Sequence, residues 1–287
     1  MKRFMLHWHL ARMLKEGFVA FVDDNALSRG AAIAFYAVTA IAPVLFVATA
    51  IVGLVLGPKA ASAAVHYQLQ KMMSAQSADL VQNAIVHARG IHHSIQGSLV
   101  GLIALIVTTS GVFTEMEDAL NVIWKAPRHE SYLFQLLRGR VLSLALVVML
   151  GFLFMVSLVV AAGIGMLGRF LNYDMLNSAF VSSVVNPGLS FVLISLLFAL
   201  IYKLMPNIDL YWRDVILGAM GTALLFLGGQ ALISLYVSRF LVANIYGAAG
   251  GVIVLLVWGY YSAQIFLLGA EFTKVFANHY GSQRRDG

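Results

Sequence analysis

Long stretches without Asp, Glu, Lys or Arg alternate with short charged segments along this chain. Six of these stretches exceed the roughly 20 apolar residues that a helix needs to cross about 30 Å of hydrocarbon. They cover residues 30–58, 90–114, 141–168, 175–202, 215–238 and 241–270. The pattern predicts an all-α, polytopic membrane bundle of six transmembrane helices.

Within a single membrane domain, 1–287, we place the spans at 30–57, 95–114, 141–167, 187–204, 214–236 and 248–272. Segment 1–28 mixes Phe and Trp with Lys and Arg, which predicts an amphipathic interfacial helix on the cytoplasmic leaflet. A cap packed under the bundle is the alternative. Segment 58–94 carries apolar side chains at helical spacing and predicts an extracytoplasmic helical segment between spans one and two.

The composition supports the membrane assignment. Hydrophobic residues make up 60% of the chain and charged residues 11%, with a mean hydropathy of +0.84. Soluble domains contain about 25% charged residues, so a water-soluble globular enzyme is excluded. The chain has no Cys, which excludes disulfides and thiolate metal sites. We interpret the net charge of +6 as attraction to anionic membrane lipids, and we expect no nucleic-acid partner.

The orientation follows from the distribution of Lys and Arg between alternate loops. With the N-terminus inside, fourteen basic residues lie on the cytoplasmic side and five on the other. Short loops rich in Lys and Arg stay cytoplasmic. We therefore expect both termini in the cytoplasm.

Polar residues near span two form the first candidate site, because hydrocarbon cannot solvate them. Glu115, Asp118 and Asn121 follow each other at intervals of three and share one helix face. This face, with Glu117 beside it, could point into the bundle from the cytoplasmic side. A solvated helix end beside Lys125 is the alternative interpretation.

The last and first spans supply the other candidates. Gln264 and Glu271 lie two helical turns apart on one face, and Tyr246-Gly247 precedes them. We expect an inward-facing Glu271 paired with Arg213, Arg138 or Arg140, with exposure at the interface as the alternative. In span one, Pro43 removes a backbone hydrogen bond and Tyr36 shares part of its face. A kink that serves only packing is the alternative there.

Enzyme signatures are missing from the sequence. The chain contains no Walker A loop, no Gly-x-Ser-x-Gly elbow and no His-Glu-x-x-His motif. His7 and His9 have a metal-like spacing but lack an Asp-His continuation, and His92-His93 lacks nearby carboxylates. We predict that the protein is not an enzyme and binds neither a metal nor a cofactor.

Several short stretches along the chain together carry a family resemblance. They are Ala31-Ala32-Ile33-Ala34-Phe35-Tyr36, Ala42-Pro43, Glu117-Asp118-Ala119-Leu120-Asn121, Met205-Pro206-Asn207, Trp212-Arg213-Asp214, Gly218-Ala219, Tyr246-Gly247, Trp258 and Leu268-Gly269-Ala270-Glu271-Phe272. With them the chain resembles the YihY / virulence factor BrkB family of bacterial inner-membrane proteins, for which the older label "ribonuclease BN" is also used. The resemblance covers almost the whole chain, with Phe35 in place of the family's Tyr.

The resemblance implies a multi-pass inner-membrane protein with six spans, both ends inside and a transporter-like role without an established substrate. It does not support the ribonuclease label, because the His-x-His-x-Asp-His motif of metallo-hydrolases is absent. We therefore expect a transporter or a lipid or amphiphile translocator without ATPase activity. Its cavity would be lined by Tyr36, Glu117, Asp118, Asn121, Arg213 and Glu271. The alternative is a non-transporting scaffold that docks envelope proteins through its outer helices.

Overall fold

The computed structural model describes residues 2–57, 110–127, 186–240 and 248–281, together with short pieces between residues 59 and 83. These parts of the chain form helices and contain no strand. The helices are α1 (Lys2–Asp23), α2 (Ala26–Leu56), α7 (Asn186–Leu204), α8 (Trp212–Phe240) and α10 (Ala248–Tyr280), with a further helical segment over residues 110–123. The all-α class predicted from the sequence is therefore observed in the described parts.

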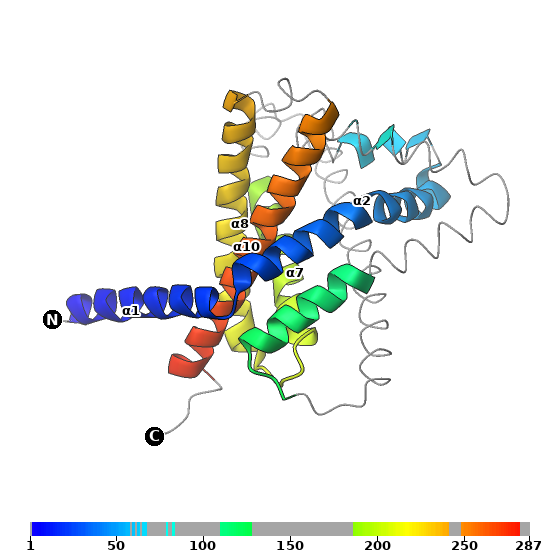
Figure 1. Ribbon diagram of the computed structural model, residues 1–287. Coiled ribbons are helices and arrows are strands. Elements are labelled where there is room, and N and C mark those ends of the chain that lie inside the picture. The colour runs from blue at the N-terminus through cyan, green and yellow to red at the C-terminus, as the bar shows by residue number, and fades with distance from the viewer. Residues whose placement is uncertain are drawn as a thin grey trace, which may run out of the picture.

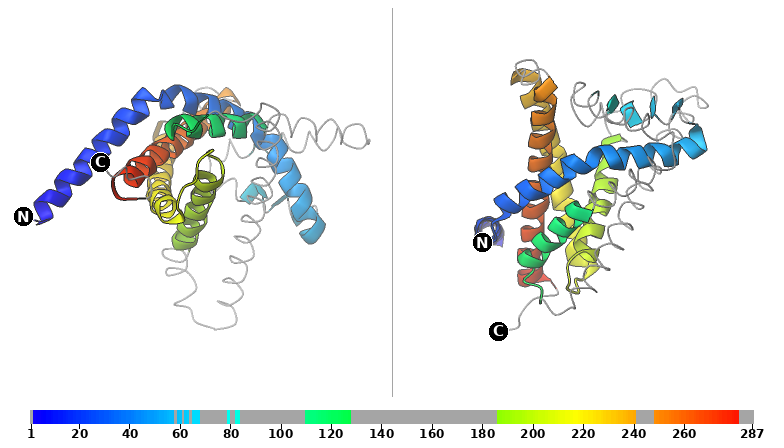
Figure 2. Two further views of the ribbon diagram at one scale, coloured as in Figure 1. Left: turned by 90° about the horizontal axis from the view of Figure 1, so that it is seen from below. Right: turned by 45° about the vertical axis from the view of Figure 1, so that its right-hand side comes forward.

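The last helix, α10, is the centre of the described structure. It packs against α1, α2 and α8, while α7 packs chiefly against α8 and reaches α10 through its aromatic side chains. Figure 1 shows α8 and α10 running alongside each other, with α2 crossing α10 and α1 extending away from the bundle. The view from below in Figure 2 shows α1 and α2 curving around the red half of α10. Most of the residues between 263 and 277 are consequently buried.

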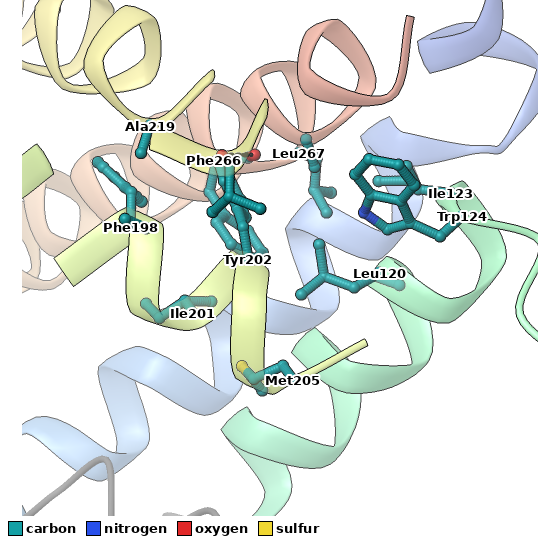
Figure 3. Packing of buried hydrophobic residues seen from close by; sticks show 14 of the residues in the cluster. Leu120, Ile123, Trp124, Phe198, Ile201, Tyr202, Met205, Ala219, Phe266 and Leu267 are labelled. Atoms are coloured by element: carbon teal, nitrogen blue, oxygen red, sulfur yellow. Dashed lines mark hydrogen bonds between the residues drawn. The ribbon is translucent and has the colours of Figure 1, made fainter. Parts of the chain in front are cut away.

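Aromatic side chains from α7 and α10 fill the core. The rings of Tyr202 and Phe266 stack with centroids 5.5 Å apart, and Phe198 stacks against both. The Tyr202 hydroxyl donates to the Phe266 carbonyl oxygen at 2.7 Å and lies 3.2 Å from the Thr222 hydroxyl on α8. Figure 3 shows that Leu120, Ile123 and Trp124 from segment 110–124 border this cluster. One buried hydroxyl thus connects three helices.

Glycines allow α8 and α10 to approach closely. A Cβ atom at Gly218 would overlap the Thr273 side chain, and one at Gly269 would overlap Thr222. Small residues at such positions are a common means of helix association in membranes, where contact between backbones and short side chains replaces a hydrophobic driving force. The Thr273 hydroxyl in turn donates to the Gly269 carbonyl oxygen at 2.6 Å.

Two residues, Asp24 and the left-handed Asn25, separate α1 from α2. Asn25 has φ 55° and ψ 37°, a conformation that Asn tolerates better than most residues. The chain therefore turns within two residues, between Asp23 at the end of α1 and Ala26 at the start of α2. This turn holds Asp24 beside α10, where the candidate site lies.

Two of the described helices contain segments long and apolar enough to cross a membrane, Pro187–Leu204 and Val252–Tyr280, as judged by length and composition. The helix α2 begins at Ala26, before the expected start of span one, and α10 continues to Tyr280, past the expected end of span six. Helical residues 110–123 likewise continue beyond the expected end of span two. The expected span 141–167 and most of segment 58–94 lie outside the described residues, so the six-span count stays a prediction.

Candidate functional site

A buried cluster of one cation and two carboxylates lies where α10 meets the α1–α2 turn. The Glu271 side chain is fully buried, at 0% exposure. The Lys274 ammonium, one turn further along α10, donates to Glu271 Oε2 at 3.1 Å and to Asp24 Oδ2 at 3.5 Å. The Lys274 and Asp24 side chains are 14% and 20% exposed. We call Asp24, Lys274 and Glu271 the acid–lysine triad.

The two carboxylate oxygens of Glu271 differ in their contacts, because Lys274 donates to Oε2 and not to Oε1. Among the described residues, Oε1 is buried and has no hydrogen-bond partner. A buried carboxylate oxygen without a partner is costly, because burial removes the water that would otherwise solvate it. The triad therefore combines a strong charge pair with one unsatisfied acceptor.

The structure corrects the expected partner of Glu271. The sequence analysis proposed Arg213, Arg138 or Arg140, whereas the cation in contact is Lys274. Arg213 is exposed at the start of α8, and the other two arginines lie outside the described residues. Intramembrane charges pair with the nearest group that can reach them, and a side chain three residues away on the same helix face satisfies this condition.

The sequence analysis did not identify Asp24 or Lys274 as candidates. The i, i+3 spacing of Glu271 and Lys274 was the available signal for the cation. Asp24 is 250 residues away from Lys274 along the chain, so only tertiary packing brings the two together.

A second polar contact fastens α1 to the end of α10. Glu16 Oε2 lies 2.7 Å from His279 Nε2, and its other oxygen accepts a bond from Arg12 Nε at 3.0 Å. The hydrogen bond from His279, followed by that from Arg12, lowers the pKa of the Glu16 carboxyl against an opposing effect of burial. On the same side of α1, Gly17 lies directly against the Phe272 ring.

We expect Glu16→Gln to remove a pH-dependent part of the stability. Because the folded-state pKa of Glu16 lies below the value of about 4.5, its contribution is complete above that pH and is lost as the pH falls through the folded-state pKa. The Glu16 side chain is 37% exposed, so the loss at neutral pH should stay below about 1 kcal/mol. Unfolding of wild type and variant in detergent, compared across this range, measures the difference. A difference that is the same at all pH values would contradict this assignment.

The buried face of the helical segment 110–123 is not the acidic face that the sequence predicted. Glu117 is buried, whereas Asp118 is exposed, so Asp118 does not point into the bundle as expected. The buried positions Phe113, Glu117, Leu120 and Trp124 follow helical spacing and define the inner face. The carboxylate on that face is thus Glu117, and Asp118 belongs to the outer one.

The remaining candidates occupy separate contacts. Asn121 accepts a hydrogen bond from the Asn207 backbone N–H at 2.8 Å. The Gln264 amide donates to the Leu27 carbonyl oxygen at 3.2 Å, and the Tyr36 ring lies against Gly111. The helix α2 continues through Pro43 without a break, and Tyr246-Gly247 lies outside the described residues.

Metal ligands do not gather in the part of the chain that the structure describes: no three His, Cys, Asp or Glu side chains there are arranged to hold an ion. The triad itself contains an ammonium group, which would repel a metal cation at the position between the two carboxylates.

Comparison with known proteins identifies the family. A family model described as Virulence factor BrkB matches residues 18–287. The chain belongs to this family. The resemblance noted in the sequence is thereby confirmed, and the chain is an integral membrane protein like its named relatives.

Two membrane proteins illustrate how similar this chain is to its relatives. A UPF0761 membrane protein of Yersinia enterocolitica is 29% identical over 211 residues, which cover 72% of this chain and 67% of the relative. A UPF0761 membrane protein of Glaesserella parasuis is 27% identical over 189 residues, or 64% of each chain. The matched region thus spans about two thirds of these relatives. No solved structure matches the chain.

Two of the stretches that carry the BrkB resemblance meet in the structure. Asn121 ends the stretch that begins at Glu117, and its side chain binds the backbone of Asn207 in Met205-Pro206-Asn207. The last stretch contains both Glu271 of the triad and Gly269 of the α8–α10 contact.

Proposed function

We propose that this protein is a transporter, or a lipid or amphiphile translocator, of the bacterial inner membrane that works without hydrolysing ATP. The observation that carries the proposal is Glu271, a fully buried carboxylate on an apolar helix with one oxygen unsatisfied. Ionisable groups inside membrane proteins are costly and occur chiefly on ion or substrate pathways. In this proposal both termini face the cytoplasm, because basic residues are concentrated there.

The surface of α1 suggests the chemistry of the substrate. Leu14, Phe18 and Val22 are spaced four residues apart and are 50%, 60% and 51% exposed. Arg12 and Lys15 are exposed beside them. An apolar stripe flanked by basic groups suits contact with anionic amphiphiles, which present acyl chains and negative headgroups together. We therefore favour an anionic lipid as the substrate class.

A lipid-transfer assay tests the proposal. The purified protein is reconstituted into vesicles that contain fluorescently labelled phosphatidylglycerol in both leaflets, and a membrane-impermeant reductant then destroys the label in the outer leaflet. Wild-type protein should make the inner-leaflet label accessible. Glu271→Gln, which keeps the shape and removes the charge, should slow this loss at least about tenfold, equivalent to about 1.4 kcal/mol in the barrier.

The control is Asp23→Asn, which removes an exposed carboxylate next to the triad. It should transfer lipid at the wild-type rate. If wild-type vesicles lose no more label than protein-free vesicles, lipid translocation is wrong, and binding of envelope proteins by a non-transporting scaffold becomes the better hypothesis. If Glu271→Gln transfers lipid as fast as Asp23→Asn, Glu271 has no role in the transfer.

A further inference from the structure

The charges of the acid–lysine triad do not balance. Lys274 contributes one positive charge, whereas Asp24 and Glu271 contribute two negative charges when both are ionised. A buried group with an uncompensated charge is strongly unfavourable in a medium of low dielectric constant. The cluster therefore favours the gain of one further positive charge.

The position of the unsatisfied oxygen shows where that charge can bind. Glu271 Oε2 already accepts a bond from Lys274, while Oε1 is buried and has no partner among the described residues. We propose that the acid–lysine triad is a proton-binding site, in which Glu271 alternates between a carboxylate paired with Lys274 and a neutral carboxylic acid protonated on Oε1. The step is a proton transfer from water: an O–H bond of a hydronium ion breaks, an O–H bond forms at Glu271 Oε1, and a neutral water molecule is left.

A proton fits this site better than a metal cation. A metal ion needs several oxygen ligands around it, and the ammonium group of Lys274 already occupies the position shared by the two carboxylates. A proton needs a single lone pair, which Oε1 supplies. The partial exposure of Asp24 and Lys274 gives the proton a route between water and the fully buried Glu271.

Other charged groups near the triad come from each neighbouring helix. Arg29 on α2 donates from Nε to the Asp24 carbonyl oxygen at 3.2 Å, which holds the turn in place. The contact between Glu16 on α1 and His279 lies further along α10, and Asp214 on α8 lies against Gly281 after the end of α10. In the described structure, the carboxylates that contact Lys274 are those of Asp24 and Glu271.

This inference deepens the proposed function by naming the proton as the ion to which translocation is coupled. Only this coupling rests on the proposed function. The test itself needs no transport. Infrared difference spectra of the full-length protein in lipid nanodiscs, recorded while the pH is varied, detect the carbonyl stretch of a protonated carboxylic acid. Wild-type protein should show one acid band that disappears as the pH rises, at the same pH in sodium and in potassium buffers.

Three variants separate the triad from other carboxyl groups. Glu271→Gln should abolish the band, and Asp23→Asn should leave it unchanged. Lys274→Met removes the competing positive charge, so the band should persist to a pH at least one unit higher than in wild type. Circular dichroism of each variant verifies that the helices are intact.

The proton site is wrong if wild-type protein lacks such a band or if the band survives in Glu271→Gln. A band that sodium suppresses at constant pH would replace the proton with a metal cation and would also overturn the proposal. Because the spectra require no lipid transfer, a negative transfer assay would refute the proposed function and leave a positive infrared result standing.

Discussion

Lys274→Met should lower the free energy of unfolding by about 3 kcal/mol at neutral pH, because it leaves two carboxylates beside each other without their cation. Of the two carboxylates, Glu271 is the more strongly destabilised, since its side chain has no exposed surface. Unfolding of the purified protein by sodium dodecyl sulfate, followed by circular dichroism, measures the change. At lower pH the loss should shrink, because protonation neutralises Glu271 in the variant.

The double variant Lys274→Met/Glu271→Gln should recover most of this loss, because it removes both charges of the closest pair. The resulting double-mutant cycle gives the coupling between the two side chains directly. The matched control is Lys15→Met, which removes an exposed lysine from α1 and should change stability by less than about 0.5 kcal/mol. Equal losses for Lys274→Met and Lys15→Met would show that the triad does not stabilise the fold.

Gly218→Ala should cost about 2–3 kcal/mol, although the same substitution usually stabilises a helix. The added methyl would overlap Thr273, and the overlap includes the Thr273 Cβ atom, which rotation about χ1 cannot move. Thr273 is fully buried and bonded to the Gly269 carbonyl oxygen, so the helices must separate instead. The same unfolding measurement detects the change.

Gly221→Ala is the matched control, because it lies three residues further along α8 and its methyl would meet no atom within 4 Å. It should be neutral or stabilising by up to about 1 kcal/mol. Gly218→Ala/Thr273→Gly moves the small residue to the other helix and should regain part of the loss. If Gly218→Ala is as stable as Gly221→Ala, the two helices do not meet through Gly218.

The sequence predicted the membrane class and several helices because those properties depend on local composition. The described helices α7 (Asn186–Leu204) and α10 (Ala248–Tyr280) overlap the spans expected at 187–204 and 248–272, whose bounds stay predictions. The sequence predicted the ends of the helices less accurately than their presence, since an apolar window does not mark where a helix stops. The helix α10 continues to Tyr280 because Lys274 and His279 have partners on α1 and at the turn, which allow polar residues to remain helical there.

The candidate site was only partly predictable. Glu271 stood out because it ends a long uncharged window, and its burial is observed. The sequence could not show which face of segment 110–123 is buried, since Glu117 and Asp118 are neighbours and their exposure depends on how that helix is rotated. Asp24 could not be found at all, because its contact with Lys274 joins residues 250 positions apart.

The central position of α10 has a consequence for biosynthesis. The helices α1 and α2 leave the ribosome well before α10, yet both pack against it. The surfaces around Gly17 and Gly30, which receive Phe272 and Gln264, therefore stay uncovered by these side chains until α10 has been translated. Contacts of such high sequence separation form slowly, and unfinished intermediates expose surface that can associate wrongly. Assembly of this protein thus depends on keeping α1 and α2 available for packing until α10 arrives.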